Sequence, residues 1–228
     1  MHPNPLDTRL LAQASIRYLA GVILVGLLLF LPAGSLMYRQ AWLLLGILFI
    51  PMLIAGTVLF MRNPDLLRRR LDAREDQGDQ RLIVLLSSVM FVSAFVVAGL
   101  TYRFRWPMLP FWSSVPFAVV FLFGYALYAA VLKQNEYLSR TIEVSEGQRV
   151  VDTGLYGLVR HPMYLSTLVL FLSAPLVLGS AFSFLIMLAY IPIIICRIKG
   201  EERVLEQELE GYRAYERRVR YRLIPHVW

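Results

Sequence analysis

Long runs without a charged residue constrain the fold of this chain more than any other feature of its sequence. Five such runs lie between consecutive arginine or lysine residues, and they contain 21, 22, 21, 27 and 36 residues in chain order. A helix needs about 20 apolar residues to cross a hydrocarbon layer of about 30 Å, so each run is long enough to span a membrane. Charged residues make up only 17% of the chain, against roughly 25% in soluble domains, which excludes an ordinary water-soluble globule.

The first four runs each predict one helix, and the fifth predicts two. Within the fifth run, the 35 residues from Pro162 to Cys196 correspond to about 52 Å of helix, which exceeds a single crossing. Pro175 and Gly179 lie in its middle among serines, so we expect the chain to turn there. The sequence therefore predicts an all-α polytopic membrane bundle. Its four spans are expected at 18–38, 40–61, 82–102 and 112–132, and its carboxyl-terminal hairpin at 162–178 and 182–198.

These elements divide the chain into two regions. Residues 1–133 are expected to form a four-span membrane region with a cytoplasmic connector at 62–81. Residues 134–228 are expected to contain a loop, the hairpin and a tail helix, and to carry the chemistry. In the connector, Asn63 can cap a helix that starts at Pro64. Leucines set among arginines there predict a short helix on the membrane surface, either a plain connector or a wall beside a cytoplasmic site.

The basic residues predict the orientation of the chain. With the amino terminus in the cytoplasm, 20 of the 23 Lys and Arg residues and all 16 acidic residues lie on the cytoplasmic side, as the positive-inside rule favours. The net charge of +7 is thus expected to attract lipid headgroups, and no nucleic-acid partner is expected. We expect both termini and any active site to face the cytoplasm. The membrane is expected to be a bacterial inner membrane or, in a eukaryote, that of the endoplasmic reticulum.

Several familiar site motifs do not occur in the sequence. It has no G-x-G-x-x-G, Walker or G-x-S-x-G motif, so a Rossmann domain, a P-loop and a serine hydrolase are unsupported. It has only three histidines, with no H-E-x-x-H motif and no Cys/His cluster. No metal site is therefore expected.

A polar cluster is instead expected where the hairpin meets the cytoplasm. Arg160 and His161 precede Pro162 at the start of the first hairpin helix. A proline at this position should leave the preceding backbone N–H groups available for an anionic ligand. Across the hairpin, Arg197 and Glu201 are four residues apart and share one helix face, so they should reach the same space. Taken singly, the arginines could also extend toward headgroups, and the glutamates could be solvated.

The residues of this cluster resemble those of a known family. The sequence G-L-Y-G-L-V-R-H-P-M-Y at 154–164 is followed by R-I-x-x-E-E-x-x-L from Arg197 and by Y-x-x-Y-x-x-x-V from Tyr212. This combination resembles the isoprenylcysteine carboxyl methyltransferase family, over about residues 134–225. The R-H-P and E-E elements are also similar to those of phospholipid N-methyltransferases. A weaker similarity to the family lies at Asn63–Leu67 and at Arg70 with Leu71.

The resemblance implies an integral membrane methyltransferase that uses S-adenosylmethionine without a Rossmann domain. The cofactor pocket of the family is built from the loop before the hairpin and the helix after it. The implied catalytic residues are Arg197, which would orient the substrate, with Glu202 and Arg218. The implied cofactor-binding residues are Gln148, Val150, Val151, Tyr156, Arg160, His161, Pro162, Tyr164, Glu201, Tyr212 and Tyr215. Gln148 replaces a histidine of eukaryotic relatives, and Ser166 replaces a glycine that is frequent in the family.

The expected reaction is carboxyl O-methylation of a lipophilic acceptor, either a small molecule or a lipidated substrate. A carboxylate is already ionised at pH 7 and needs no general base. N-methylation of an amine is the alternative, with Glu202 or His161 as the base. A second enzyme class is a membrane reductase of the sterol type that uses NADPH. A transporter is a third class, but the predicted spans contain no charged residue of the kind transporters place near the midplane.

Overall fold

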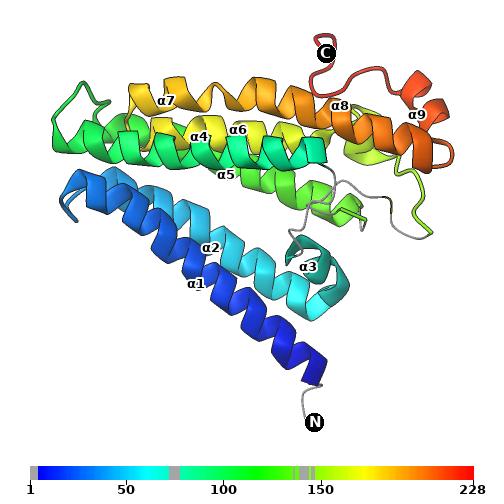
Figure 1. Ribbon diagram of the computed structural model, residues 1–228, viewed down its shortest axis with the longest axis horizontal. Helices are drawn as coiled ribbons and strands as arrows, with labels where there is room; N and C mark the ends of the chain where they lie inside the picture. The colour runs from blue at the N-terminus through cyan, green and yellow to red at the C-terminus, as the bar shows by residue number, and fades with distance from the viewer. Residues whose placement is uncertain (1–4, 72–77, 136, 139–143, 145–146) are drawn as a thin grey trace.

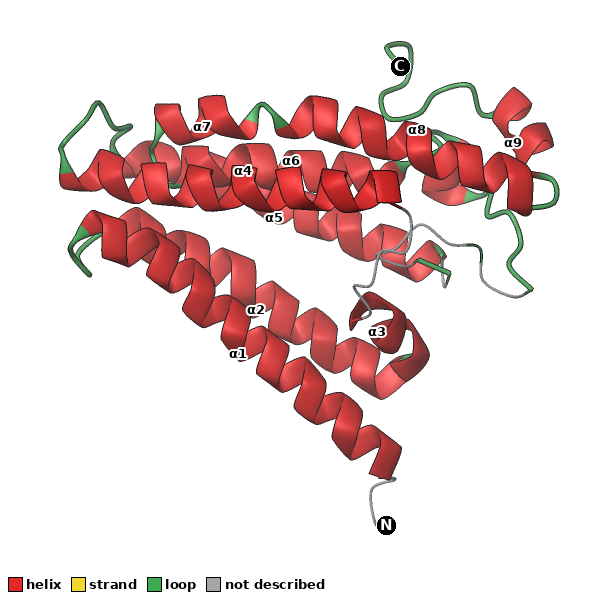
Figure 2. Ribbon diagram, viewed as in Figure 1, coloured by secondary structure: helices red, strands yellow, loops and turns green. Residues whose placement is uncertain are grey.

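The computed structural model describes residues 5–71, 78–135, 137–138, 144 and 147–228, and most of these residues lie in helices. These ranges contain no β-strand, and each helix is followed by a loop or turn (Figure 2). Helices α1 and α2 lie side by side and diverge from the other helices toward the amino terminus (Figure 1). The elements are α1 (Pro5–Ala33), α2 (Arg39–Arg62), α3 (Pro64–Leu71), α4 (Gly78–Arg103), α5 (Phe111–Gln134), the 3-10 helix η1 (Gly154–Gly157), α6 (Pro162–Val177), α7 (Ala181–Met187), α8 (Tyr190–Glu208) and α9 (Tyr212–Arg218).

Among the described residues, five helical stretches are long and apolar enough to cross a membrane. They are Thr8–Ala33, Arg39–Arg62, Leu82–Arg103, Phe111–Gln134 and Ala181–Glu208. Helix α6 is apolar but shorter, with 16 residues. Large apolar side chains on these helices are exposed, for example Ile16 at 67% and Val119 at 62%, as expected for side chains that face lipid. The prediction of an all-helical integral membrane protein is confirmed.

Two predicted boundaries are wrong. The first helix is shifted from 18–38 to Pro5–Ala33, because the chain turns at Gly34, where φ is +63°. The predicted helix at 182–198 is instead α7 followed by α8, which continues to Glu208. Pro192 accounts for the break, because it lacks the N–H that would bond to the carbonyl of Leu188. That carbonyl accepts from the N–H of Ile191 at 3.1 Å instead.

The turn of the carboxyl-terminal hairpin lies against the two other turns at the same end of the bundle. The N–H of Leu109 donates to the carbonyl of Gly179 at 2.9 Å, which ties the α4–α5 connection to the hairpin turn. The hydroxyl of Tyr38, before α2, donates to the carbonyl of Leu178 at 2.6 Å. The hairpin formed by α6 and by α7 with α8 therefore turns at the same end of the bundle as the α1–α2 and α4–α5 connections.

The connector forms the short helix that its first residues predict. The N–H of Leu66 donates to Oδ1 of Asn63 at 3.1 Å, so Asn63 caps α3. Leu66 and Leu67 are buried, at 3% and 6% exposure, and α3 packs against α2. The remainder of the predicted connector at 72–77 lies outside the described residues.

Candidate functional site

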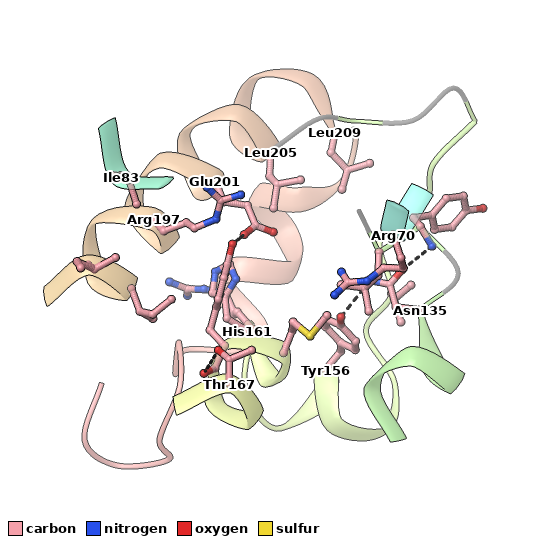
Figure 3. A pocket seen from close by; sticks show the side chains of 18 of the residues that line it. Arg70, Ile83, Asn135, Tyr156, His161, Thr167, Arg197, Glu201, Leu205 and Leu209 are labelled. Carbon is pink, nitrogen blue, oxygen red and sulfur yellow. Dashed lines mark hydrogen bonds between the residues drawn. The ribbon is translucent and has the colours of Figure 1, made fainter. Parts of the chain in front are cut away.

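A cavity of about 430 Å³ lies where the loop before η1 meets α6, α8 and α9. One part of it is polar and is lined by this loop, η1 and the carboxyl-terminal half of α8. The other part is apolar and lies between α4, α6 and α8. Figure 3 shows Arg197 and Glu201 on one side of the cavity and Arg70 with Asn135 on the other. Most of the predicted site residues line this cavity, namely Gln148, Val150, Val151, Tyr156, Arg160, His161, Tyr164, Arg197, Glu201, Tyr212 and Tyr215.

The hairpin brings its two bases together, as predicted. Tyr164, in the first turn of α6, donates from its hydroxyl to Oε2 of Glu201 on α8 at 2.6 Å. Arg197 lies one helical turn before Glu201 and lines the same cavity. A tyrosine, a carboxylate and a guanidinium therefore meet at the junction of the polar and apolar parts.

Glu202 faces a different environment from Glu201. It is only 3% exposed and is not among the residues that line the cavity. Its Oε1 accepts from Nε of Arg160 at 2.9 Å and lies 3.2 Å from Nε2 of His161. Its Oε2 accepts from Nε of Arg222 at 2.7 Å. Glu202 thus joins the start of α6 to α8 and to the segment after α9.

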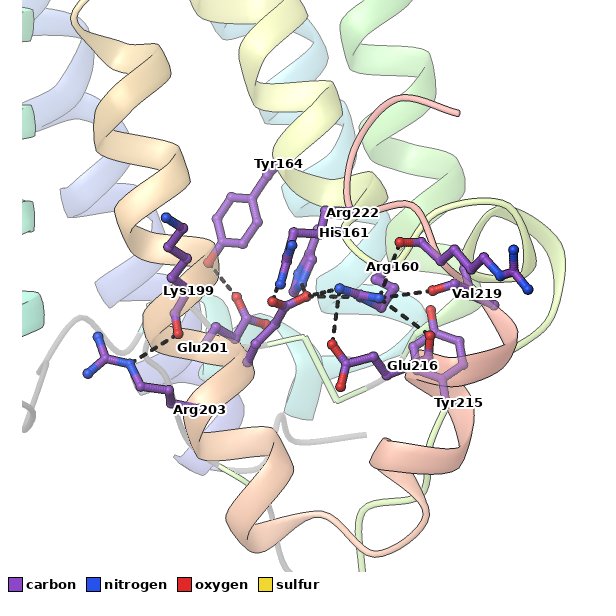
Figure 4. A network of polar contacts seen from close by, with 12 residues as sticks. Arg160, His161, Tyr164, Lys199, Glu201, Arg203, Tyr215, Glu216, Val219 and Arg222 are labelled. Atoms are coloured by element: carbon purple, nitrogen blue, oxygen red, sulfur yellow. Dashed lines mark hydrogen bonds and ion pairs between the residues drawn. The ribbon is translucent and has the colours of Figure 1, made fainter. Parts of the chain in front are cut away.

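Arg160 is the second centre of this network (Figure 4). Its Nη1 donates to the carbonyl of Val219 at 3.1 Å, and its Nη2 lies 3.2 Å from Oε1 of Glu216. The backbone N–H groups of Arg160 and His161 donate to the carbonyls of Tyr221 and Arg222, both at 2.9 Å. The expectation that these N–H groups are available to an anionic ligand is therefore wrong. The segment after α9 occupies them.

Tyrosines form one wall of the polar part. Tyr215 donates from its hydroxyl to the carbonyl of Tyr156 at 2.8 Å, and Asn135 donates to the hydroxyl of Tyr156 at 3.1 Å. Burial raises the pKa of Tyr156, Tyr212 and Tyr215 well above the ordinary value, so all three stay neutral. The Tyr212 hydroxyl is buried and has no hydrogen-bond partner within the described parts of the chain. A buried hydroxyl of this kind is a candidate contact for a ligand.

Three predicted site residues do not line the cavity. Arg218 forms an ion pair with Asp152, and its side chain is 62% exposed. Pro162 is buried at the start of α6, where it begins the helix. Glu202 belongs to the network described above. Among the described residues, no group of three or more His, Cys, Asp and Glu side chains could hold a metal ion.

Sequence reasoning did not assign Arg70 to the site, although it singled out its segment. Helix α3 places Arg70 in the wall of the cavity, where it donates to the hydroxyl of Tyr128 on α5. Its guanidinium carbon lies 5.5 Å from the centroid of the Tyr128 ring. The weak similarity at Arg70 and Leu71 was the signal that could have identified it. The described part of the connector thus forms a wall of the site.

The R-H-P sequence lies at the base of α6 and the E-E sequence lies on α8, so the two elements that carry the predicted resemblance meet in space. Residues 117–207 match the isoprenylcysteine carboxyl methyltransferase family. This match confirms the resemblance and extends from α5 through nearly all of α8. It includes the cavity residues His161, Arg197 and Glu201. The matched segment covers less than half of the chain, and over this segment the chain is similar to a family of carboxyl methyltransferases.

A protein of another class is also similar to part of the chain. Over 91 residues, the chain is 31% identical to Delta(14)-sterol reductase TM7SF2 of Mus musculus. The matched stretch is 39% of this chain and 22% of the reductase, so the chain spans about a fifth of that relative's length. The similarity to the methyltransferase family therefore coexists with a partial similarity to a membrane reductase.

Proposed function

We propose that this protein is an integral membrane methyltransferase that uses S-adenosylmethionine and methylates a lipophilic acceptor, with a carboxylate as the preferred nucleophile. One observation carries the proposal. A single cavity joins a polar chamber at the loop end to an apolar arm between helices, and Arg197 and Glu201 lie at the junction. A water-soluble cofactor and a lipidic acceptor need such a pair of adjoining environments. The positive-inside rule favours a chamber that faces the cytoplasm.

The residues of the polar chamber fit the cofactor. The Glu201 carboxylate can bind a cationic group, and the buried Tyr212 hydroxyl can donate a hydrogen bond. Val150 and Val151 offer an apolar surface to an aromatic base. Neutral tyrosine rings nearby favour a cation through their negative faces. When bound, S-adenosylmethionine supplies an electrophilic methyl group on a positively charged sulfur.

Arg197 is suited to orient the acceptor. A guanidinium can hold a carboxylate through two parallel hydrogen bonds, which fix both its position and its plane. The apolar residues of the arm exclude water from this carboxylate, and alignment within the cavity brings it to near-attack distance. No protein group has to remove a proton, because the carboxylate is ionised at pH 7.

The network around Glu202 removes one of the two bases that an amine acceptor could use. An amine acceptor needs a base, and the candidates were Glu202 and His161. Glu202 is buried outside the cavity wall and accepts from two arginines, while His161 lies 3.2 Å from the same carboxylate. We therefore assign Glu202 a positioning role, in which it fixes Arg160 and His161 at the start of α6.

Calorimetric titration of the detergent-purified protein with S-adenosylmethionine and S-adenosylhomocysteine tests the proposal. We expect micromolar binding, weakened at least tenfold by Glu201→Gln and unchanged by Glu208→Gln, because Glu208 is exposed on the same helix. No binding to folded protein would overturn the proposal. Binding of NADPH in its place would support the reductase class, which the partial similarity to the sterol reductase favours.

A further inference from the structure

The apolar arm of the cavity is lined by three helices. The hydroxyl groups in its wall already form hydrogen bonds within the protein. Ser87 and Ser88 donate to carbonyls of their own helix at 2.8 Å, and the hydroxyl of Tyr190 donates to Oγ1 of Thr167 at 3.0 Å. The arm therefore favours a hydrocarbon over a polar group. Its lining residues are Ile83, Val84, Ser87, Ser88 and Phe91 of α4, Thr167 and Phe171 of α6, and Tyr190, Ile193 and Ile194 of α8.

Three aromatic rings close the inner end of the arm. On each of the three helices, the lining residue farthest from the polar chamber is aromatic, namely Phe91, Phe171 and Tyr190. Phe171 meets Phe91 edge-on, with ring centroids 4.7 Å apart, and meets Tyr190 edge-on at 5.1 Å. The third pair, Phe91 and Tyr190, is separated by 5.9 Å. The three rings contact one another and form a continuous stop.

The other end of the arm has a polar anchor and an exposed wall. Arg197 is seven residues after Tyr190 on α8, a separation of about 10 Å along the helix axis. Val84 lines the arm and is 45% exposed, so the arm reaches the outer surface of α4. A chain with an anionic head at Arg197 can therefore lie along the arm toward the aromatic stop.

We propose that Phe91, Phe171 and Tyr190 form an end-stop that limits the length of the hydrocarbon chain that the site accepts. The acceptor class is an anionic lipid with one chain, its head at Arg197 and its chain end against the three rings. The assignment of this ligand as a methyl acceptor rests on the proposed function. The length limit itself depends only on the shape of the arm.

Photolabelling tests the end-stop directly. The protein in nanodiscs is irradiated with straight-chain fatty acids, from octanoic to hexadecanoic acid, that carry a diazirine at the chain end, and the labelled residues are mapped by mass spectrometry. We expect labelling of the three aromatic residues to peak at one chain length. In Phe171→Ala the optimum should lengthen by roughly two carbons or more, because removal of a ring opens space for additional methylenes.

Two further variants keep the test decisive. Ser87→Phe places a ring in the arm from α4 and should shorten the optimum even if Phe171→Ala does not fold. Phe95→Ala removes a ring from the same helix as Phe91 but outside the cavity lining, and should leave the optimum unchanged. An unchanged optimum in both Phe171→Ala and Ser87→Phe, or an equal shift in Phe95→Ala, would overturn the end-stop.

The labelling does not require methyl transfer, so the two proposals fail separately. If labelling depends on chain length but the protein does not bind S-adenosylmethionine, the proposed function is overturned and the end-stop is supported. If the protein binds S-adenosylmethionine but labelling does not depend on chain length, the end-stop is overturned and the proposed function is supported.

Discussion

Glu201 and Glu202 are adjacent on α8 but have different surroundings. Glu201 lines the cavity and accepts from Tyr164, whereas Glu202 is buried between Arg160 and Arg222. For Glu202→Gln we expect a loss of about 3 kcal/mol in stability, because the buried Arg160 loses one of the two carboxylates that it pairs with and Arg222 loses its carboxylate partner. Thermal unfolding of the purified protein should show a clearly lower midpoint.

The neighbouring variant Glu201→Gln is the matched control. It removes the same charge one residue away and is expected to unfold near the wild-type temperature while cofactor binding weakens. If Glu202→Gln kept the unfolding temperature and lost binding, Glu202 would be a ligand contact rather than a positioning residue.

Tyr212 gives a second prediction for a single residue. Its hydroxyl is buried without a hydrogen-bond partner in the described chain, and burial raises its pKa, so the group remains a protonated donor. We expect Tyr212→Phe to leave the unfolding temperature unchanged or slightly raised. Affinity for S-adenosylhomocysteine should fall about three- to tenfold, the value of one neutral hydrogen bond. Unchanged affinity in the calorimetric titration would remove this hydroxyl from the cofactor site.

The adjacent glutamates also show what the sequence could not predict about the site, namely which of the two side chains faces the cavity. Successive helical residues differ by about 100° in direction, so they face different neighbours. The motif indicated that both belong to the site. Only the positions of α6 and of the segment after α9 show that Glu201 faces the cavity and Glu202 does not. Arg218 similarly needed the position of Asp152 to be placed outside the cavity.

Among the elements, α5 and α6 pack closely at a glycine. A Cβ atom at Gly124 would lie 2.9 Å from Cγ of Leu170 and 3.1 Å from its backbone N. We expect Gly124→Ala to destabilise the protein by about 1–3 kcal/mol, because the helix pair must separate to admit the methyl group. Thermal unfolding measures the loss. Gly56→Ala is the control, since nothing lies within 4 Å of a Cβ there, and an equal loss in both variants would contradict the packing argument.

The helices differ in how well the sequence predicted them, and local chemistry explains the difference. The start of α3 was predictable because Asn63 and Pro64 act within one turn. The break between α7 and α8 was missed because an apolar run shows length but not continuity, although Pro192 was a usable signal. The carboxyl-terminal half of α8 was expected as part of a separate tail helix, and its continuity with the hairpin helix was missed because its charged residues lie beyond the predicted apolar span.

At the scale of the whole molecule, the orientation can be measured with introduced cysteines in a Cys196→Ala background. Leu36 lies in the turn between α1 and α2, and Glu210 lies between α8 and α9; both are exposed. We expect a membrane-impermeant maleimide to label Leu36→Cys in intact cells and Glu210→Cys only after permeabilisation, because basic residues are retained on the cytoplasmic side. The reverse pattern would place the cavity on the opposite side.

The network of Arg160 has a consequence for the order in which the protein is made. The carbonyls of Val219, Tyr221 and Arg222 hold the base of α6, yet these residues are translated after all of the described membrane helices. The base of α6 can therefore be fixed only after the chain has been synthesised as far as Arg222. A chain interrupted after α9 would lack the three carbonyls that hold the base of α6.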